Sequence, residues 1–493
     1  MATRRTVLKA AVGAGLVTSF TGVLTGINAL ANTKLRVRKN LADLSPDDDD
    51  VVVYRDFVHY MQQQDQSKPV SWLQYSLMHG NIDTGKYRYC PHGDWYFLPW
   101  HREFVLMYEN AARELLSAPD FAMPYWNWTD NRTMPEAFAD PTYKGKPNAL
   151  FVPNRHQLAG KYALTDHIVG PQYFTLPGDP DYTSQSVYSE TNFEVFGTSR
   201  NPQQKDTKMK WVRAGGGYQG TLESLPHNLV HNNIGAFMPT PGSPRDPVFM
   251  MHHSHIDGIW TRWNALGRSN STDSLWLDMV FKDNYIDPAG KFYSKAVNEL
   301  LDTNALGYTY DNLPQNDGVI EAPARQQNLL ALFTENPLLA DQSGLRRFSA
   351  DESEFMGNAL TSLTASVSMP TETMTFSQDD SPKQIYALIG DIMLSNGVTS
   401  VRVFINHPGP TVSTGADDPH FVTELSFLSH APGDGKGMPS AMVDLSPTLQ
   451  ALGQIGRLSD DDIAVQLLPV PVPGQVVSEK DAVMAGSVEI VAL

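Results

Sequence analysis

The sequence is short of cysteine and of positive charge. Cys90 is the only cysteine among 493 residues, so the chain can form no internal disulfide. Its stability must come from packing, oligomerisation or a bound metal. The 37 lysines and arginines face 54 acidic residues, which gives a formal net charge of −17. This balance argues against a nucleic-acid partner, because proteins that bind nucleic acids need a basic surface.

Long apolar runs are missing beyond the first 31 residues, so we expect no membrane span in the mature chain. Residues 1–31 carry twin arginines at positions 4 and 5, a Gly- and Ala-rich stretch, and Ala-Leu-Ala at positions 29–31. This pattern predicts a twin-arginine signal that is removed after export, which makes the mature protein periplasmic or secreted. A membrane anchor is the alternative, but the segment is short and interrupted by glycines.

Helical and strand-like patterns occupy different parts of the remaining chain. Helical periodicity falls in the first part, over residues 98–116, 221–234 and 247–266. Strand-like alternation falls near the C-terminus, as in residues 401–405. We therefore expect three parts. These are a mainly α domain (32–315), a linker (316–367) and an all-β domain that forms a sandwich or barrel-like fold (368–493).

Histidines are concentrated in the predicted α domain, where residues 59–255 hold eleven of the fourteen. His227 and His231 are four residues apart, so a helix places both imidazoles on one face. His252 and His253 are adjacent, so only one of them can face the same metal. Clusters of imidazoles without cysteine pairs or motif carboxylates favour copper or zinc. Three nitrogens per metal leave a position open for O2 or substrate, and a zinc hydrolase is one alternative.

A second triplet lies earlier in the chain. His79 ends an aromatic helical stretch, and His101 begins the helix predicted over residues 98–116. His92 precedes His101 by nine residues, a spacing that would place the two on opposite sides of one helix. His92 must therefore lie in the loop before that helix if both bind one metal.

Two motifs carry a resemblance to a known family. Residues 90–102 (CPHGDWYFLPWHR) and 246–260 (DPVFMMHHSHIDGIW) resemble the two copper-binding regions of type-3 copper proteins. That family includes tyrosinases, catechol oxidases and hemocyanins. The resemblance implies a four-helix bundle wrapped by long loops, with a dinuclear copper centre that uses O2 as co-substrate. It assigns the ligands of the first copper to His79, His92 and His101, and those of the second to His227, His231 and His253.

The resemblance also implies roles near the ligands. A thioether between Cys90 and His92 is one expectation, with a buried free thiol as the alternative. Glu223 and Asn228 are expected to hold a water near the second copper, where it can act as the base for a phenol. A carboxylate that interacts with the helix dipole is the alternative for Glu223.

Other residues are expected to support the centre. Asp257 lies one helical turn after His253 and is expected to orient a ligand or an arginine, with an ordinary salt bridge as the alternative. His252 and His255 are expected to be structural or to contact the ligands. An arginine near Leu35-Arg36-Val37-Arg38 is expected to pack on the tyrosines of Gly307-Tyr308-Thr309-Tyr310 by a cation–π contact.

The predicted β domain loosely resembles the domain that follows the catalytic part in plant polyphenol oxidases. There it covers the active site and keeps the enzyme latent, and we expect the same here. The function implied is a tyrosinase that hydroxylates monophenols and oxidises o-diphenols to o-quinones, with small phenols as partners. The alternatives are a catechol oxidase, an o-aminophenol oxidase and a hemocyanin-like O2 carrier. Asn232, directly after His231, stands where some bacterial tyrosinases have an arginine. Assembly into a homo-oligomer is compatible with the sequence.

Overall fold

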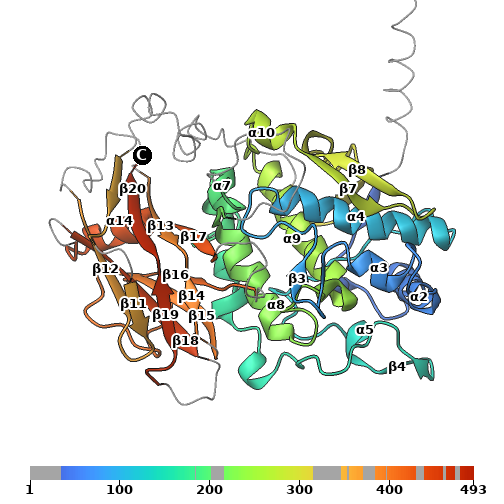
Figure 1. Ribbon diagram of the computed structural model, residues 1–493, viewed down its shortest axis with the longest axis horizontal. Coiled ribbons are helices and arrows are strands. Elements are labelled where there is room, and N and C mark those ends of the chain that lie inside the picture. Colours follow the sequence, from blue (N-terminus) through green and yellow to red (C-terminus); the bar gives the residue numbers. More distant parts are fainter. Residues whose placement is uncertain are drawn as a thin grey trace, which may run out of the picture.

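The computed structural model describes residues 35–183, 185–200, 216–314, 346–351, 355–369, 384–395, 397–428, 438–458, 462–471 and 478–492. The predicted export signal and residues 316–345 of the predicted linker lie outside these ranges. A helical domain and a β-rich domain stand side by side (Figure 1). No helix in the described part is long and apolar enough to cross a bilayer.

The helical domain confirms the expected mainly α architecture. Its principal helices are α2 (Asp49–Gln63), α4 (Phe97–Leu115), α8 (Asn228–Ile234) and α9 (Val248–Ala265). Every side chain from Phe97 to Glu109 in α4 is buried, and so is every side chain from Val248 to Thr261 in α9. Helices buried all round form the interior of a domain rather than its surface.

Local chemistry fixes where two of these helices begin. The Asp246 carboxylate accepts the Val248 N–H at 2.9 Å and pairs with Arg155 at 2.6 Å, which anchors the start of α9. A π-helical turn, Glu223–His227, runs directly into α8. Pro226 lies inside this turn and has no N–H to donate, so the normal helical bonding pattern is interrupted and the turn widens.

Short elements and long loops wrap the four helices. The strand β1 (Arg36–Arg38) pairs in parallel with β9 (Tyr308–Tyr310) and so joins the two ends of the domain. The short helices are α3 (Trp72–Ser76), α5 (Glu136–Ala139), α6 (Asp166–Val169), α7 (Phe193–Phe196) and α10 (Ser274–Leu277). The hairpins are β2 (Gly80–Asn81) with β3 (Lys86–Tyr87), β4 (Thr142–Tyr143) with β5 (Lys146–Pro147), and β7 (Val280–Ile286) with β8 (Phe292–Ala296).

Within the residues that the structure describes, the β domain contains three sheets and one helix, α14 (Ser446–Gln454). The four-stranded sheet has the order β12 (Leu363–Ser368), β18 (Asp462–Pro471), β15 (Val398–Ile405), β16 (Phe421–Leu425). The three-stranded sheet has the order β11 (Phe355–Asn358), β19 (Ala482–Ala485), β14 (Met393–Leu394). The five-stranded sheet has the order β10 (Arg346–Ser349), β20 (Ser487–Ala492), β13 (Ile385–Gly390), β17 (Ser440–Asp444), β6 (Tyr218–Gln219). Apolar side chains of the two larger sheets share one core, which makes the domain a sandwich.

The β domain begins earlier than the sequence led us to expect. Residues 346–368, placed mostly in a linker, form β10, β11 and β12. Buried and exposed residues alternate along β12, with Leu363, Ala365 and Val367 facing the core. Small and polar residues dominate this segment, so its strand period was hidden by its composition.

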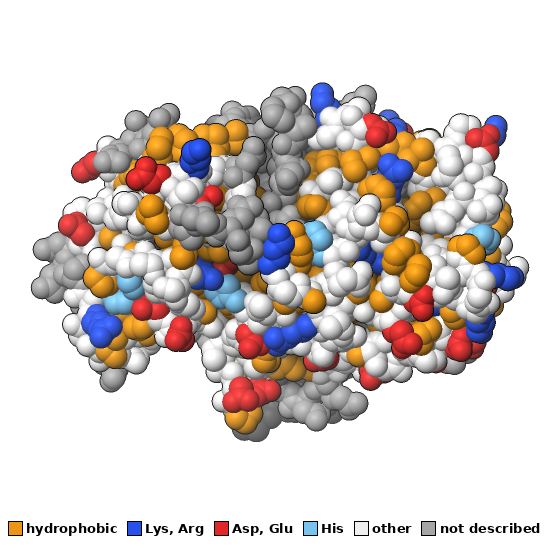
Figure 2. All heavy atoms as spheres, turned by 90° about the horizontal axis from the view of Figure 1, so that it is seen from below, with side chains coloured by type: hydrophobic (Ala, Val, Ile, Leu, Met, Phe, Trp, Pro, Cys, Tyr) orange, Lys and Arg blue, Asp and Glu red, His pale blue; other side chains and the backbone are white. Residues whose placement is uncertain are grey.

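The two domains share a strand. β6 comes from the helical domain, yet it pairs in parallel with β17 at the edge of the five-stranded sheet, with Tyr218 opposite Ser440. Beside it, Val195 of the helical domain packs against Tyr386, Leu388 and Met442. On the face shown in Figure 2, basic side chains of the described residues lie singly among acidic and apolar ones.

Candidate dinuclear metal centre

The first histidine group is buried beside the start of α4. His79 lies in the turn after α3, His92 lies in the loop before α4, and His101 lies in the first turns of α4. The Nδ1 of His79 is 2.8 Å from the Pro241 carbonyl, and the Nδ1 of His101 is 2.8 Å from the Phe97 carbonyl. A carbonyl can only accept, so both Nδ1 atoms carry the proton and Nε2 keeps its lone pair.

The second group has its ring nitrogens converging on one point. The Nε2 of His253 is 3.3 Å from the Nε2 of His227 and 3.2 Å from the Nε2 of His231. The Nδ1 of His231 donates to the Met238 carbonyl at 2.7 Å, and the Nδ1 of His227 donates to Oδ1 of Asn228 at 2.8 Å. The Nε2 lone pairs of His227 and His231 therefore both face the Nε2 of His253, and three converging ring nitrogens at this distance fit a metal between them.

His252 lies close to the same group but in a tautomer that cannot bind a metal there. Its ligand atom, like that of His253, lies within 4.8 Å of those of His227 and His231. The indole N–H of Trp128 donates to Nδ1 of His252 at 3.0 Å. Neutral His252 must therefore carry its proton on Nε2, which leaves no free lone pair for a metal. The hydrogen-bond pattern thus selects His253, as the family resemblance does.

The two groups form a single centre. The rings of His101 and His253 stack with centroids 4.4 Å apart, and the rings of His92 and His227 lie 5.7 Å apart. Burial lowers the pKa of His227 and His253 well below the ordinary value and that of His231 to about 4. Neutral imidazoles are the state in which histidine binds a metal.

Cys90 lies against the same first group. Its Sγ is 3.7 Å from Nδ1 and 3.5 Å from Nε2 of His92. An atom nearly equidistant from both ring nitrogens lies close to the plane that passes between them through Cε1. The sulfur is also 3.2 Å from Nε2 of His101. The thiol is buried, so any reaction it undergoes occurs inside the centre.

Glu223 and Asn228 are both buried beside the second group, and protein atoms contact both. One oxygen of Glu223 accepts the Gly93 N–H at 2.8 Å, and the other accepts the Thr198 hydroxyl. The amide nitrogen of Asn228 donates to Oε1 of Gln219 at 3.0 Å and to the Ser426 carbonyl at 2.6 Å. Sequence reasoning missed Gln219 and Ser426, and no local signal marks either of them.

Asp257 contacts arginines rather than an imidazole. Its carboxylate pairs with Arg102 at 2.5 Å and with Arg38 at 3.1 Å, and it accepts the hydroxyls of Tyr308 and Tyr310, each at 2.7 Å. Burial alone would raise its pKa, but the Arg102 and Arg38 guanidiniums hold the pKa below its ordinary value. The Arg38 guanidinium lies 3.7 Å from the Tyr308 ring centre, which confirms the expected cation–π contact.

His255 is also buried away from the centre. Its ring stacks on Tyr125 at 5.5 Å and meets the edge of Trp128 at 4.3 Å. It contacts no member of the two ligand groups among the described interactions. This agrees with a structural role for His255 in packing α9 against the loop that carries Trp128.

Comparison with known proteins identifies the helical domain. Residues 57–266 match the family model described as the common central domain of tyrosinase. The chain carries a tyrosinase-family copper domain. The tyrosinase HcTyr1 of Hahella sp. (strain CCB-MM4) is 25% identical over 487 residues, which covers 88% of this chain and 95% of that protein. Polyphenol oxidase D of Solanum lycopersicum is 25% identical over 474 residues, covering 89% of this chain and 75% of that protein.

Solved structures share both domains. Latent apple tyrosinase superposes with a TM-score of 0.62 at 21% identity and covers 93% of this chain and 98% of its own. Latent aurone synthase, a polyphenol oxidase, gives a TM-score of 0.64 at 19% identity and covers 94% and 90%. The helical core followed by a β domain is therefore a known architecture of polyphenol oxidases.

The tyrosinase-family protein is a copper oxidoreductase, and its residues fit two copper ions. Each buried group offers three imidazole nitrogens, and neither includes a carboxylate. Such donor sets suit copper, and the family sets aside the zinc hydrolase. When bound, the copper pair supplies the redox chemistry with O2 that no amino-acid side chain can perform. The chain supplies the buried ligands, their orientation and the surrounding hydrogen-bond partners.

Proposed function

We propose that the protein is a tyrosinase that hydroxylates small monophenols at the ortho position and oxidises the resulting o-diphenols to o-quinones. The observation that carries the proposal is a buried carboxylate, Glu223, in the same helical segment as the ligands His227 and His231. A monophenol must lose its proton before it binds as a phenolate. In this proposal Glu223 receives that proton through a water, and Asn228 orients the water once its amide is released from the Ser426 carbonyl. Six imidazoles, from His79, His92, His101, His227, His231 and His253, hold the copper pair.

The Glu223→Gln variant tests this assignment. Glutamine keeps an oxygen for the Gly93 N–H but cannot act as a base at neutral pH. We expect tyrosine turnover to fall by about 10²-fold or more, with a smaller loss on catechol. Oxygen uptake on both substrates measures the ratio, under conditions in which the parent chain turns over catechol.

Glu194→Gln is the matched control for this experiment. Burial raises the pKa of Glu194 to about 8, so its carboxyl is already neutral at pH 7 and the same exchange should change little. An equal loss on tyrosine and catechol would remove Glu223 from proton transfer. A parent chain that consumes oxygen with catechol only is a catechol oxidase. Reversible oxygen binding without turnover of either substrate indicates a carrier.

The sulfur of Cys90 supports a further part of the proposal, a thioether to Cε1 of His92. O2 would be the oxidant: the new C–S bond replaces one S–H and one C–H bond, and O2 takes up the two hydrogens with their electrons as H2O2. The intact mass of copper-loaded protein exposed to air decides the matter, because the bonded form is lighter by two hydrogens.

We also propose that the chain is exported by the twin-arginine route.

We also propose that the β domain covers the approach to the second copper group and keeps the enzyme latent. Ser426 follows the end of β16, and its N–H donates to the Ser224 carbonyl at 2.9 Å. The Ser426 carbonyl takes one hydrogen of the Asn228 amide. The Asn232 amide donates to the Ser426 hydroxyl at 2.9 Å and to the Phe427 carbonyl at 3.3 Å. A phenol that needs Asn228 must therefore displace this segment.

Asn232→Asp should release the β domain. The exchange removes the donor of two hydrogen bonds and sets a negative charge against the Phe427 carbonyl. At about 1 kcal/mol for each lost bond, docking should weaken by roughly tenfold or more, and catechol turnover should rise. Asn233→Asp is the control, because among the described residues the Asn233 side-chain amide donates to the Leu229 carbonyl of its own helix and to no group of the β domain. Equal activity of both variants and the parent would contradict latency by this contact.

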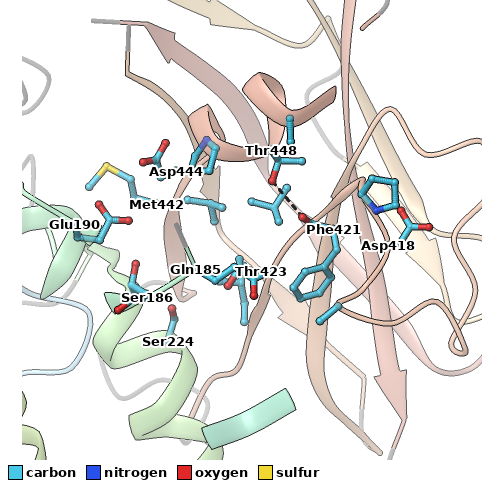
Figure 3. A pocket seen from close by; sticks show the side chains of 18 of the residues that line it. Gln185, Ser186, Glu190, Ser224, Asp418, Phe421, Thr423, Met442, Asp444 and Thr448 are labelled. Atoms are coloured by element: carbon cyan, nitrogen blue, oxygen red, sulfur yellow. Dashed lines mark hydrogen bonds between the residues drawn. The ribbon is translucent and has the colours of Figure 1, made fainter. Parts of the chain in front are cut away.

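A cavity of about 300 Å³ between the domains is expected to make the docking of the β domain depend on pH. Glu190 of the helical domain and Asp444 of β17 both line it, together with Asp417 and Asp418, and none of its described lining residues is a lysine or arginine (Figure 3). Burial, and then the Asp444 carboxylate, raise the pKa of Glu190 well above its ordinary value, opposed by Arg268. Burial raises the pKa of Asp444 to about 6, opposed by hydrogen bonds from Ser446.

Latency should therefore weaken as the pH rises. The docked state holds protons more tightly than the separated domains, so docking is strongest below the ordinary carboxyl pKa and is lost as the pH rises through about 6 and above. One proton changes the docking equilibrium by at most about tenfold per pH unit. Glu190→Gln should flatten the pH profile of catechol turnover relative to the parent, whereas Asp417→Asn should not. If Glu190→Gln leaves the pH profile of catechol turnover unchanged, Glu190 and Asp444 do not control docking.

A further inference from the structure

Three methionines form a row across the three-stranded sheet of the β domain. Met484 of β19 lies directly opposite Met356 of β11 on one side and opposite Met393 of β14 on the other. Figure 1 shows these three strands together in the β domain. Residues directly opposite in an antiparallel pair point to the same face, with Cβ atoms about 4.5–5.5 Å apart. The three thioether side chains therefore stand side by side.

The row faces solvent. Met356 is 70% exposed and Met393 is 37% exposed, while Met484 is partly exposed. Their neighbours along the strands, Phe355 and Val483, are buried in the core. Exposed methionine contributes nothing to that core, so packing does not account for three of them in one row.

A fourth methionine lies near the end of the row. Met438 is 49% exposed and directly precedes Pro439, whose carbonyl accepts the Ile392 N–H at 2.7 Å. Ile392 in turn directly precedes Met393. Thioether groups are therefore concentrated at this edge of the sheet.

Thioether sulfur is a soft ligand that prefers Cu+ to hard cations such as Mg²⁺ or Ca²⁺. The outer strands lie about 9–10 Å apart, which is twice the strand spacing. Methionine has three rotatable side-chain bonds, so Met356 and Met393 can both turn toward Met484. The net charge of −17 favours binding of a cation over an anion.

We propose that Met356, Met393 and Met484 bind one Cu+ ion at the surface, separate from the dinuclear centre. The site takes copper in the form that thioethers bind, without imidazole or carboxylate. Its existence does not depend on which phenol the enzyme oxidises, so it can fail while the proposed function holds.

The test adds Cu+ to the full chain already loaded with its copper pair. Ascorbate under nitrogen keeps the ion reduced, and bicinchoninate competes for it. We expect one further equivalent of copper to be retained, with sulfur neighbours in its X-ray absorption spectrum. The variant Met356→Leu/Met393→Leu/Met484→Leu should lose this equivalent, because leucine keeps the volume and removes the sulfur. Met369→Leu, a change at a buried methionine of the same domain, should retain it.

Three results overturn the proposal. The first is that the parent chain retains no further equivalent of copper. Another is equal retention by the triple variant, with its fold verified by circular dichroism. The third is an effect of the triple variant on sedimentation alone, which would make the row a contact between protein chains.

Discussion

Replacing His253 with Asn should leave the protein with one copper and almost no oxidase activity. His253 supplies the Nε2 that meets the Nε2 atoms of both His227 and His231. Asparagine is too short to place a donor there, so the second group falls to two ligands. A catalytic metal lowers the activation barrier by several kcal/mol, and losing about 4 kcal/mol of this effect reduces the rate roughly 10³-fold. Copper content of the denatured protein and catechol turnover measure both effects.

His252→Asn is the matched control, because it changes the adjacent histidine of the same helix. The side-chain oxygen of asparagine can take the place of Nδ1 and accept the Trp128 N–H. We therefore expect two copper ions and turnover within about tenfold of the parent, in the range of changes around a ligand. The assignment is wrong if His252→Asn loses a copper and His253→Asn keeps both.

This pair of variants also marks how far the sequence alone could go. Helical spacing places His227 and His231 on one face, because both lie within a single segment of local structure. The choice between His252 and His253 came from a family resemblance. Its physical cause is a hydrogen bond from Trp128, which lies 124 residues earlier in the chain. Local patterns predict which residues share a face, but the tautomer depends on a contact made only after folding.

The contacts around Asn228 show the same limit more strongly. Its partners, Gln219 and Ser426, include one that lies 198 residues away in another domain. Neither the spacing nor the composition near Ser426 distinguishes it from any other residue after a strand. The start of the β domain was missed for a different reason. Strands β10 to β12 are rich in small and polar residues, so they become strands by pairing with β18, β19 and β20 rather than by propensity.

The Asp257→Asn exchange is expected to destabilise the helical domain by about 3–5 kcal/mol while leaving every copper ligand in place. Asp257 joins two buried arginines and two tyrosine hydroxyls, and Arg38 also pairs with Glu109 at 2.8 Å. Removing the Asp257 charge leaves Arg38 with Glu109 alone and takes from Arg102 its carboxylate partner, and the buried, uncompensated charge accounts for the cost. An effect below 1 kcal/mol would mean that water reaches this cluster.

Urea unfolding followed by tryptophan fluorescence measures this change in the helical domain alone, because all nine tryptophans lie between residues 72 and 276. Asp50→Asn serves as the control, since Asp50 pairs with the half-exposed Lys39 and should change stability by no more than about 1 kcal/mol. The lowered pKa of Asp257 also fixes the sign of the pH effect. Its ion pairs stabilise the parent above the ordinary carboxyl pKa and are lost as the pH falls through the lowered value. The stability difference between the parent and Asp257→Asn should therefore be full at neutral pH and shrink in strong acid, whereas a cost that came only from altered packing would stay constant.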